Sequence, residues 1–193
     1  MTIENLLDIS TREGLYQWYL DNHDKAKEFW IRDNRAAKPF PGVIDYIDAV
    51  EVALCFGWID STQKRIDDGK PLQHFTPRRK GSNWCEQNIE RCRRLIKRGE
   101  MTPAGEAVLP DMNPEHFVFE GWVLDALKAD PQAWKNFQSF PENYKRIKVD
   151  RIQHYMHTKR PDYAMATLQK FIADTKKGIL QRGWSDNGRL ENY

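Results

Sequence analysis

The dipeptide Asp68-Gly69 limits the folds that this chain can adopt. Asp-Gly is a strong signal for a two-residue β-hairpin loop, and here it separates residues 58–67 from residues 70–77. A two-residue loop would place Ile66 opposite Pro71, which lacks an amide donor and is tolerated on an edge strand. We therefore expect a small antiparallel sheet built on a central β-hairpin.

Helical signals fill most of the remaining chain. Residues 83–98 carry an apolar arc at helical spacing, and Gly99 follows as a stop. Further helices are expected near residues 11–26, 45–57, 121–129, 141–157 and 161–178, with more starts at Thr102-Pro103 and Asp130-Pro131. Residues 28–34 are expected to add a third strand, because a lone hairpin is marginally stable. The fold class is therefore α+β and mostly helical.

The proline-punctuated stretch at residues 110–114 divides the 193-residue chain. Residues 1–110 would hold the N-terminal helices, the hairpin and the basic helix. Residues 114–180 would form a C-terminal helical subdomain, and the polar residues 184–193 would form a loose tail.

Composition indicates a globular domain. Hydrophobic residues make up 40% of the chain, and the formal net charge is only +2. No apolar run approaches the ~20 residues of a membrane span, and the first fifteen residues lack the pattern of a secretory leader. An odd number of cysteines argues against a disulfide framework. We expect a cytoplasmic protein with no membrane contact.

The most unusual stretch is residues 78–98, with eight cations against two acids. The pair Glu90 and Arg94 and the helix dipole account for the cations near its end, but not for those before the helix. Guanidinium groups bind phosphate and carboxylate in a bidentate way, so the segment predicts an anion site. The candidate ligand-binding residues are Trp58, Asp60, Lys64, Phe75, Arg78, Arg79, Ser82 and Trp84.

These residues have distinct expected roles. Arg78 and Arg79 would hold the anion, beside a loop at Ser82 that offers backbone amides. Phe75 and Trp84 would stack on the ligand, while Asp60 and Lys64 would fix the loop. The leading hypothesis is a non-enzymatic binder of an anionic small molecule or partner.

Other functions stay open. The basic patch at residues 78–98 would suit nucleic acid, Asp60 could act as a general base in a small-molecule enzyme, and exposed tryptophans would suit an interaction module. Asp150, His154 and His157 share one side of a helix, but their solvent-facing position argues against a metal site. The usual nucleotide-binding signatures are absent, so no cofactor is expected.

Three blocks carry a family resemblance: ALCFGWID at residues 53–60, FTPRRKGSNW at 75–84 and GEMTPAG at 99–105. In this order they resemble the bacterial YdeI/OmpD-associated family, also called bacteriocin-protection proteins. The resemblance covers about residues 15–178 and is looser in the C-terminal third, where residues 157–164 lack an expected arginine. Cys85 stands where a serine cap is usual, which moves the expected helix cap to Asn83. The resemblance implies an intracellular stress or antimicrobial-peptide tolerance protein, and it implies no reaction.

Overall fold

The structure, a computed structural model, describes residues 3–35, 41–65, 71–158 and 160–193. It contains two compact units. Unit 1 comprises Met1–Asn83 and Arg91–Pro110, and unit 2 comprises Trp84–Glu90 and Asp111–Tyr193. Helix α3 (Glu86–Lys97) therefore contributes its beginning to unit 2 and its remainder to unit 1. The division expected from the sequence differs in residues 84–90.

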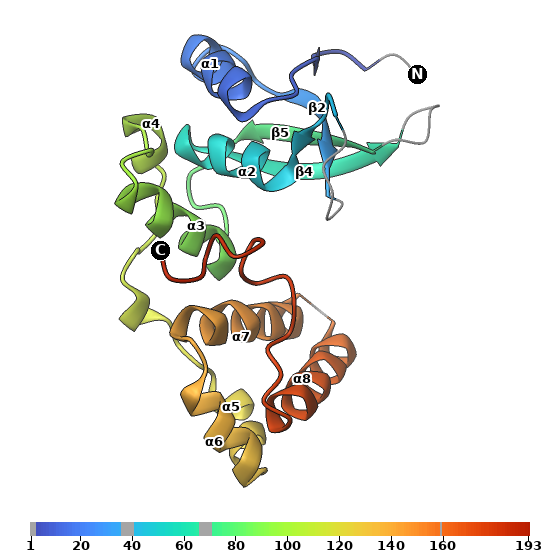
Figure 1. The fold of residues 1–193 in the computed structure, drawn as a ribbon, viewed down its shortest axis with the longest axis vertical. Coiled ribbons are helices and arrows are strands. Elements are labelled where there is room, and N and C mark those ends of the chain that lie inside the picture. The colour runs from blue at the N-terminus through green and yellow to red at the C-terminus, as the bar shows by residue number, and fades with distance from the viewer. Residues whose placement is uncertain (1–2, 36–40, 66–70, 159) are drawn as a thin grey trace. The chain divides into compact units, whose positions relative to one another are not determined.

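Unit 1 is built on a small mixed sheet with the strand order β1-β2-β5-β4, and β3 also pairs with β2. Figure 1 labels β2, β4 and β5 of this sheet. The strands are β1 (Leu6–Leu7), β2 (Phe29–Asn34), β3 (Ile44–Asp45), β4 (Trp58–Arg65) and β5 (Pro71–Pro77). Strand β5 pairs antiparallel with both β4 and β2, whereas β1 and β3 run parallel to β2. The α+β class, the hairpin and the third strand are confirmed, and the sheet is mixed rather than wholly antiparallel.

The hairpin has a different register from the expected one. Arg65, not Ile66, lies opposite Pro71. Residues 66–70, including Asp68-Gly69, lie outside the described residues. A register shift between Asp60 and Gln63 bulges β4, and the Gln73 side-chain amide donates to the Ser61 and Thr62 carbonyls there at 3.3 and 3.2 Å.

The helices of unit 1 begin at capping side chains. Helix α1 (Arg12–Asn22) follows Thr11, and α2 (Tyr46–Cys55) follows Asp45, which accepts from the Ile47 and Asp48 amides. The short α4 (Pro103–Glu106) follows Thr102. Helix α2 packs against β4 and α1, and buried aromatic rings fill the space around them.

Gly105 of α4 allows a very close approach to the end of α2. A Cβ at this position would lie 2.3 Å from the Cys55 carbonyl oxygen and 2.6 Å from the Met101 sulfur. The same carbonyl accepts hydrogen bonds from the amide and the hydroxyl of Thr102. The GEMTPAG block thus places a glycine where no side chain fits.

Unit 2 is helical in its described residues. Its helices are α5 (Gly121–Lys128), α6 (Pro131–Ser139), α7 (Glu142–His157) and α8 (Pro161–Lys176), preceded by the 3-10 turn η1 (Pro114–His116). Val123, Leu127, Phe137, Leu168 and Phe171 are buried in its core. Figure 1 shows α7 and α8 as consecutive neighbours, and the two helices pack against each other.

The C-terminal segment corrects the expectation of a loose tail. Trp184 and Leu190 are buried in the core of unit 2. The Trp184 ring meets the Tyr144 ring edge-on at 5.4 Å, and Asn143 donates to the Leu190 carbonyl at 2.7 Å. A mostly polar segment packs here because its two large apolar side chains are anchors.

Candidate functional site

A groove of about 610 Å3 lies in unit 2 between α7, α8 and the segment that follows α8. Four cationic side chains line it: Lys148 and Arg151 from α7, Lys170 from α8, and Arg182. We call this site the cationic groove. Ile152, Tyr163, Ala166, Thr167, Asp174 and Gln181 complete its lining.

Helical spacing explains why these side chains share one hollow. Lys148, Arg151 and Ile152 stand at i, i+3 and i+4 in α7, and such positions lie on one face of a helix. In α8, Tyr163 and Lys170 are seven residues apart and likewise share a face. Because α7 and α8 are packed together, their two faces become the walls of the groove.

Hydrogen bonds fix the third wall. The Gln181 amide donates to the buried Tyr144 hydroxyl at 3.1 Å, and the Gln181 side chain donates to Asp174 at 2.8 Å. The Lys148 ammonium donates to the Arg182 carbonyl at 2.7 Å. These three bonds tie the loop backbone to both helices, so the position of Arg182 is built into the fold.

The charges of the groove are not balanced by the protein. None of its four cations forms an ion pair with a carboxylate within the part of the chain that the structure describes. Asp174 is the one acid of the lining, so four positive charges against one negative give +3. A cluster of like charges is unfavourable in the empty groove, and an anion would offset this repulsion.

Lys148 shows the effect of this environment. The side chain is half-buried, and burial together with the nearby charge of Arg151 lowers its pKa from its usual 10.5 to about 8. An anion within the groove would favour the ammonium form and raise this pKa again. The titration of Lys148 is therefore a reporter of what the groove contains.

Two aromatic residues of the expected anion site, Trp58 and Phe75, are in the core of unit 1. The Trp58 side chain is 1% exposed and Phe75 is 0% exposed, and the Phe75 ring stacks on Phe29 at 5.1 Å. Neither ring has a free face, so neither Trp58 nor Phe75 can contact a ligand as we expected from the sequence. The alternation that buries them depends on packing against β2 and α1, which the hairpin sequence does not reveal.

Arg78 is also turned inward. It is buried, and its Nη1 donates to the Ser82 hydroxyl at 3.2 Å and to the Asn83 carbonyl at 3.3 Å. Arg78 thus holds its own loop, whereas Arg79 is exposed. Trp84 belongs to unit 2. Anion binding by Arg79 and Ser82, and stacking by Trp84, stay predictions.

Asp60 and Lys64 of β4 have local partners. Asp60 accepts a hydrogen bond from the Tyr46 hydroxyl at 2.8 Å, and the Lys64 ammonium lies 4.9 Å from the centre of the Trp30 ring. Burial and the Asp60 carboxylate raise the pKa of Tyr46. A general-base role for Asp60 has no observation behind it and stays a prediction.

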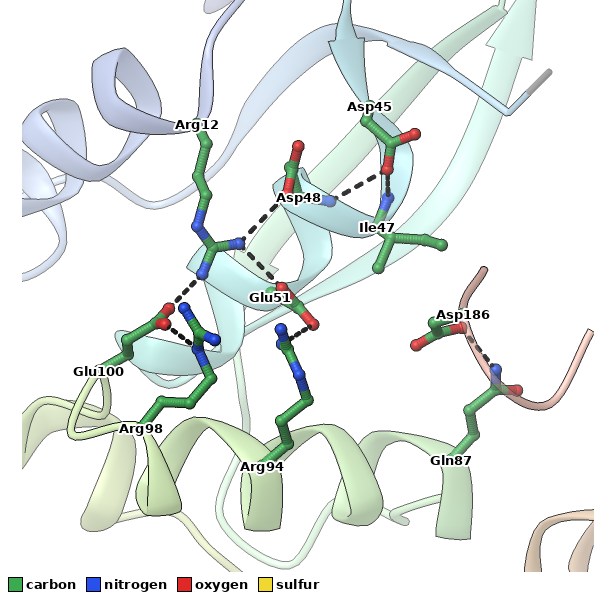
Figure 2. Close-up of polar contacts among 10 residues, drawn as sticks. All are labelled: Arg12, Asp45, Ile47, Asp48, Glu51, Gln87, Arg94, Arg98, Glu100 and Asp186. Carbon is green, nitrogen blue, oxygen red and sulfur yellow. Dashed lines mark hydrogen bonds and ion pairs between the residues drawn. The ribbon is translucent and has the colours of Figure 1, made fainter. Parts of the chain in front are cut away.

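Cations of the basic segment are bound to carboxylates in unit 1. Arg94 donates to the buried Glu51 at 2.7 Å, and Arg12 donates to its other oxygen at 2.9 Å (Figure 2). Arg98 pairs with Glu100, which also accepts from Arg12. Burial alone would raise the pKa of Glu100, but these arginine contacts outweigh it and lower the pKa. Arg94 and Arg98 thus stabilise the fold.

The carboxylate of Asp150 has a structural role. Its Oδ2 accepts from the amide of Glu86, the first residue of α3, at 3.0 Å. This contact supplies an acceptor at the helix start, where the sequence suggested Asn83. Over the described ranges, no group of three or more His, Cys, Asp or Glu residues could hold a metal ion.

Hydropathy adds one observation about the helices. In the described parts of the chain, no helix combines the length and the apolar character needed to cross a bilayer.

No sequence pattern singled out the residues of the cationic groove. Its lining comes from α7, α8 and the loop after α8, and the proximity of these segments is a tertiary property. One local signal was present: neither Lys148 nor Arg151 has an acid three or four positions away along the helix. An acid at one of these positions would have stabilised the helix through an ion pair.

Two family models match the chain. Residues 7–108, more than half of the 193 residues, match a domain of unknown function, DUF8412. Residues 117–178 match the family described as "Bacteriocin-protection, YdeI or OmpD-Associated". The family resemblance is thus confirmed for the C-terminal part, while the three sequence blocks that suggested it lie in the DUF8412 match. No curated protein and no solved structure matches the chain.

Proposed function

We propose that this chain, which belongs to the DUF8412 family, is a binding protein for a small, multiply charged anion and that the cationic groove of unit 2 is its binding site. The observation that carries the proposal is the set of four groove cations without carboxylate partners among the described residues. Like charges held close together repel one another, and a ligand of opposite charge would offset this repulsion.

The chemistry of the lining indicates the ligand class. Arg151 and Arg182 can each present two parallel N–H donors to a phosphate or carboxylate, and Lys148 and Lys170 add point charges. Tyr163 and Ala166, which are exposed, add apolar surface beside these cations. A ligand with two or more negative charges fits this set better than a singly charged one.

Most residues that line the groove lie within residues 117–178, which match the family described as "Bacteriocin-protection, YdeI or OmpD-Associated". We further propose that anion binding by the groove contributes to bacteriocin protection, as part of a stress-tolerance role in the cytoplasm. The test is survival of bacteriocin-treated cells that express the protein. We expect Lys170→Glu combined with Arg182→Glu to abolish protection. Full protection by a folded double variant would separate the groove from this role.

Calorimetric titration with sulfate and with pyrophosphate, at constant ionic strength, tests binding directly. We expect the Lys170→Glu/Arg182→Glu variant to bind at least about tenfold more weakly, because charge-assisted hydrogen bonds contribute ~1.5–3 kcal/mol each. Lys135→Glu is the matched control, since Lys135 is an exposed cation of α6 outside the groove. Equal affinity in wild type and double variant would contradict the proposal.

A further inference from the structure

The amine of Lys148 occupies a distinctive position inside the cationic groove. It comes from the middle of α7, and its side chain is only partly exposed. Its Nζ is held by the Arg182 carbonyl at 2.7 Å, and Ile152 lies one helical turn further along the same wall. This hydrogen bond fixes the nitrogen beside Arg182, another residue of the groove lining.

Nucleophilic chemistry at a lysine requires the neutral amine. Partial burial and a neighbouring cation are the two conditions that activate lysines for attack on carbonyl groups. Both hold for Lys148, since Arg151 is the neighbouring cation, and its pKa of about 8 leaves a substantial neutral fraction near neutral pH. The hydrogen bond to a carbonyl acceptor leaves the nitrogen lone pair of the neutral amine available.

The other groove cations would position a reactant for this amine. Arg151, Lys170 and Arg182 line the same hollow and can hold a phosphate or a carboxylate. A molecule anchored in this way gains effective concentration at the Lys148 nitrogen. Thr167 and Asp174 add polar groups that can exchange protons with a bound carbonyl oxygen.

We propose that Lys148 forms a reversible imine with a small carbonyl compound that also carries a phosphate or a carboxylate, which the other cations of the groove hold. This inference rests on the proposed function, because it uses the same groove and the same anion contacts. It goes further by naming the ligand as an anionic aldehyde or ketone and by assigning a covalent bond to one residue.

The step balances without a further reactant. The nitrogen lone pair attacks the carbonyl carbon, a C–N bond forms, and the carbonyl electron pair moves to oxygen. Transfer of one proton from nitrogen to oxygen gives a carbinolamine. Loss of the second nitrogen proton and the hydroxyl group as one water molecule leaves the C=N bond. Hydrolysis reverses the sequence, so no oxidant or reductant is consumed.

Borohydride trapping tests the proposal. The protein is incubated separately with glyceraldehyde 3-phosphate, pyruvate and uncharged glyceraldehyde, reduced, digested and mapped by mass spectrometry. We expect an adduct at Lys148 that forms roughly tenfold faster than at exposed lysines, with the phosphate or carboxylate probe ahead of glyceraldehyde. The two anionic probes show which headgroup the groove prefers. Inorganic sulfate should suppress the reaction.

Variants make the result specific. Lys148→Arg should lose the groove adduct, with circular dichroism confirming its fold, while Lys135→Arg, outside the groove, should keep it. Labelling spread evenly over exposed lysines would overturn the inference. If sulfate binds to the wild type in calorimetry but no Lys148 adduct forms, the imine is wrong and the anion site stands. If sulfate does not bind either, both proposals fall.

Discussion

Glu51 is a carboxylate buried at the centre of the ion-pair cluster in unit 1. Its side chain is 1% exposed, and Arg12 and Arg94 each donate to one of its oxygens (Figure 2). The two guanidinium groups compensate the desolvation cost of burying the Glu51 carboxylate. Asp48 contacts the same Arg12 at 3.4 Å but remains partly exposed, so it experiences more solvent screening.

We predict that Glu51→Ala destabilises the protein by about 3–5 kcal/mol, because it leaves two partly buried guanidinium groups without their shared acceptor. Asp48→Ala, the matched change at the rim, should cost less than about 1 kcal/mol. Urea unfolding of both variants measures the difference. Equal losses would show that burial of the carboxylate does not decide its contribution.

Lys148 predicts a pH dependence of anion binding. Its pKa is lowered in the folded protein, so between about pH 8 and 10.5 the unfolded chain holds a proton that the folded chain has lost. Stability therefore rises with pH through this window, and below pH 8 the charged Lys148 is a constant cost to stability. A bound dianion removes that cost only while the ammonium form exists.

Sulfate should therefore raise the thermal midpoint more below pH 8 than above pH 10, at matched ionic strength. Thermal melts with sulfate and with chloride measure the difference. Lys135→Met is the control for general salt effects, and Lys148→Met should lose the pH-dependent part. A sulfate effect that is independent of pH in the wild type would contradict this assignment.

At the scale of elements, the contact between α4 and α2 shows why a four-residue helix occurs in this sequence. Gly105 lets the α4 backbone reach the end of α2, and Thr102 supplies two hydrogen bonds to the Cys55 carbonyl. A side chain at position 105 would overlap backbone, which cannot move as a flexible side chain can.

We predict that Gly105→Ala lowers the free energy of unfolding by about 1–3 kcal/mol, because its methyl group would lie 2.3 Å from the Cys55 carbonyl oxygen. Gly81→Ala is not a suitable control because Gly81 has a positive φ. Gly121→Ala, where a Cβ meets nothing within 4 Å, is the appropriate one. Chemical denaturation compares them, and equal stability of the Gly105 variant and wild type would refute the steric account.

Elements with local signals were predictable. Asp45, Thr102 and Asp130 precede helices and accept amide hydrogen bonds within two or three residues, so sequence alone reveals them. The hairpin register was not predictable from Asp-Gly. Arg65 instead pairs with Pro71, and the packing of the flanking strands against β2 and the helices decides this register.

Sites formed by tertiary contacts were harder to predict. The expected anion site included Phe75 and Trp58, yet both rings are core residues. The cationic groove instead combines Lys148 and Arg182, which are far apart in sequence. No local spacing rule brings such segments together.

At the scale of the whole molecule, the end of the chain completes the core of unit 2. Trp184 is 6% exposed and Leu190 is 0% exposed, and both belong to the core cluster. The loop that carries Gln181 and Arg182 lies directly before Trp184 in the chain. We therefore expect that releasing Trp184 from the core would also displace the loop with Gln181 and Arg182 and disturb the cationic groove.

We predict that Trp184→Ala destabilises unit 2 by about 3–5 kcal/mol, as expected for removal of a buried tryptophan, and also weakens sulfate binding. Lys177→Ala, an exposed position after α8, should do neither. Near-UV circular dichroism and calorimetry measure the two effects. Unchanged stability of the Trp184 variant would show that the tail does not support the fold.

A crystal structure of the protein with selenate is the most direct measurement of whether the cationic groove binds an anion. Selenium scatters anomalously, so the anion can be located without bias. We expect an anomalous peak within hydrogen-bond distance of Arg151, Lys170 or Arg182, and loss of that peak in the Lys170→Glu/Arg182→Glu variant. Ordered selenate only elsewhere on the protein, with an empty groove in the wild type, would contradict it.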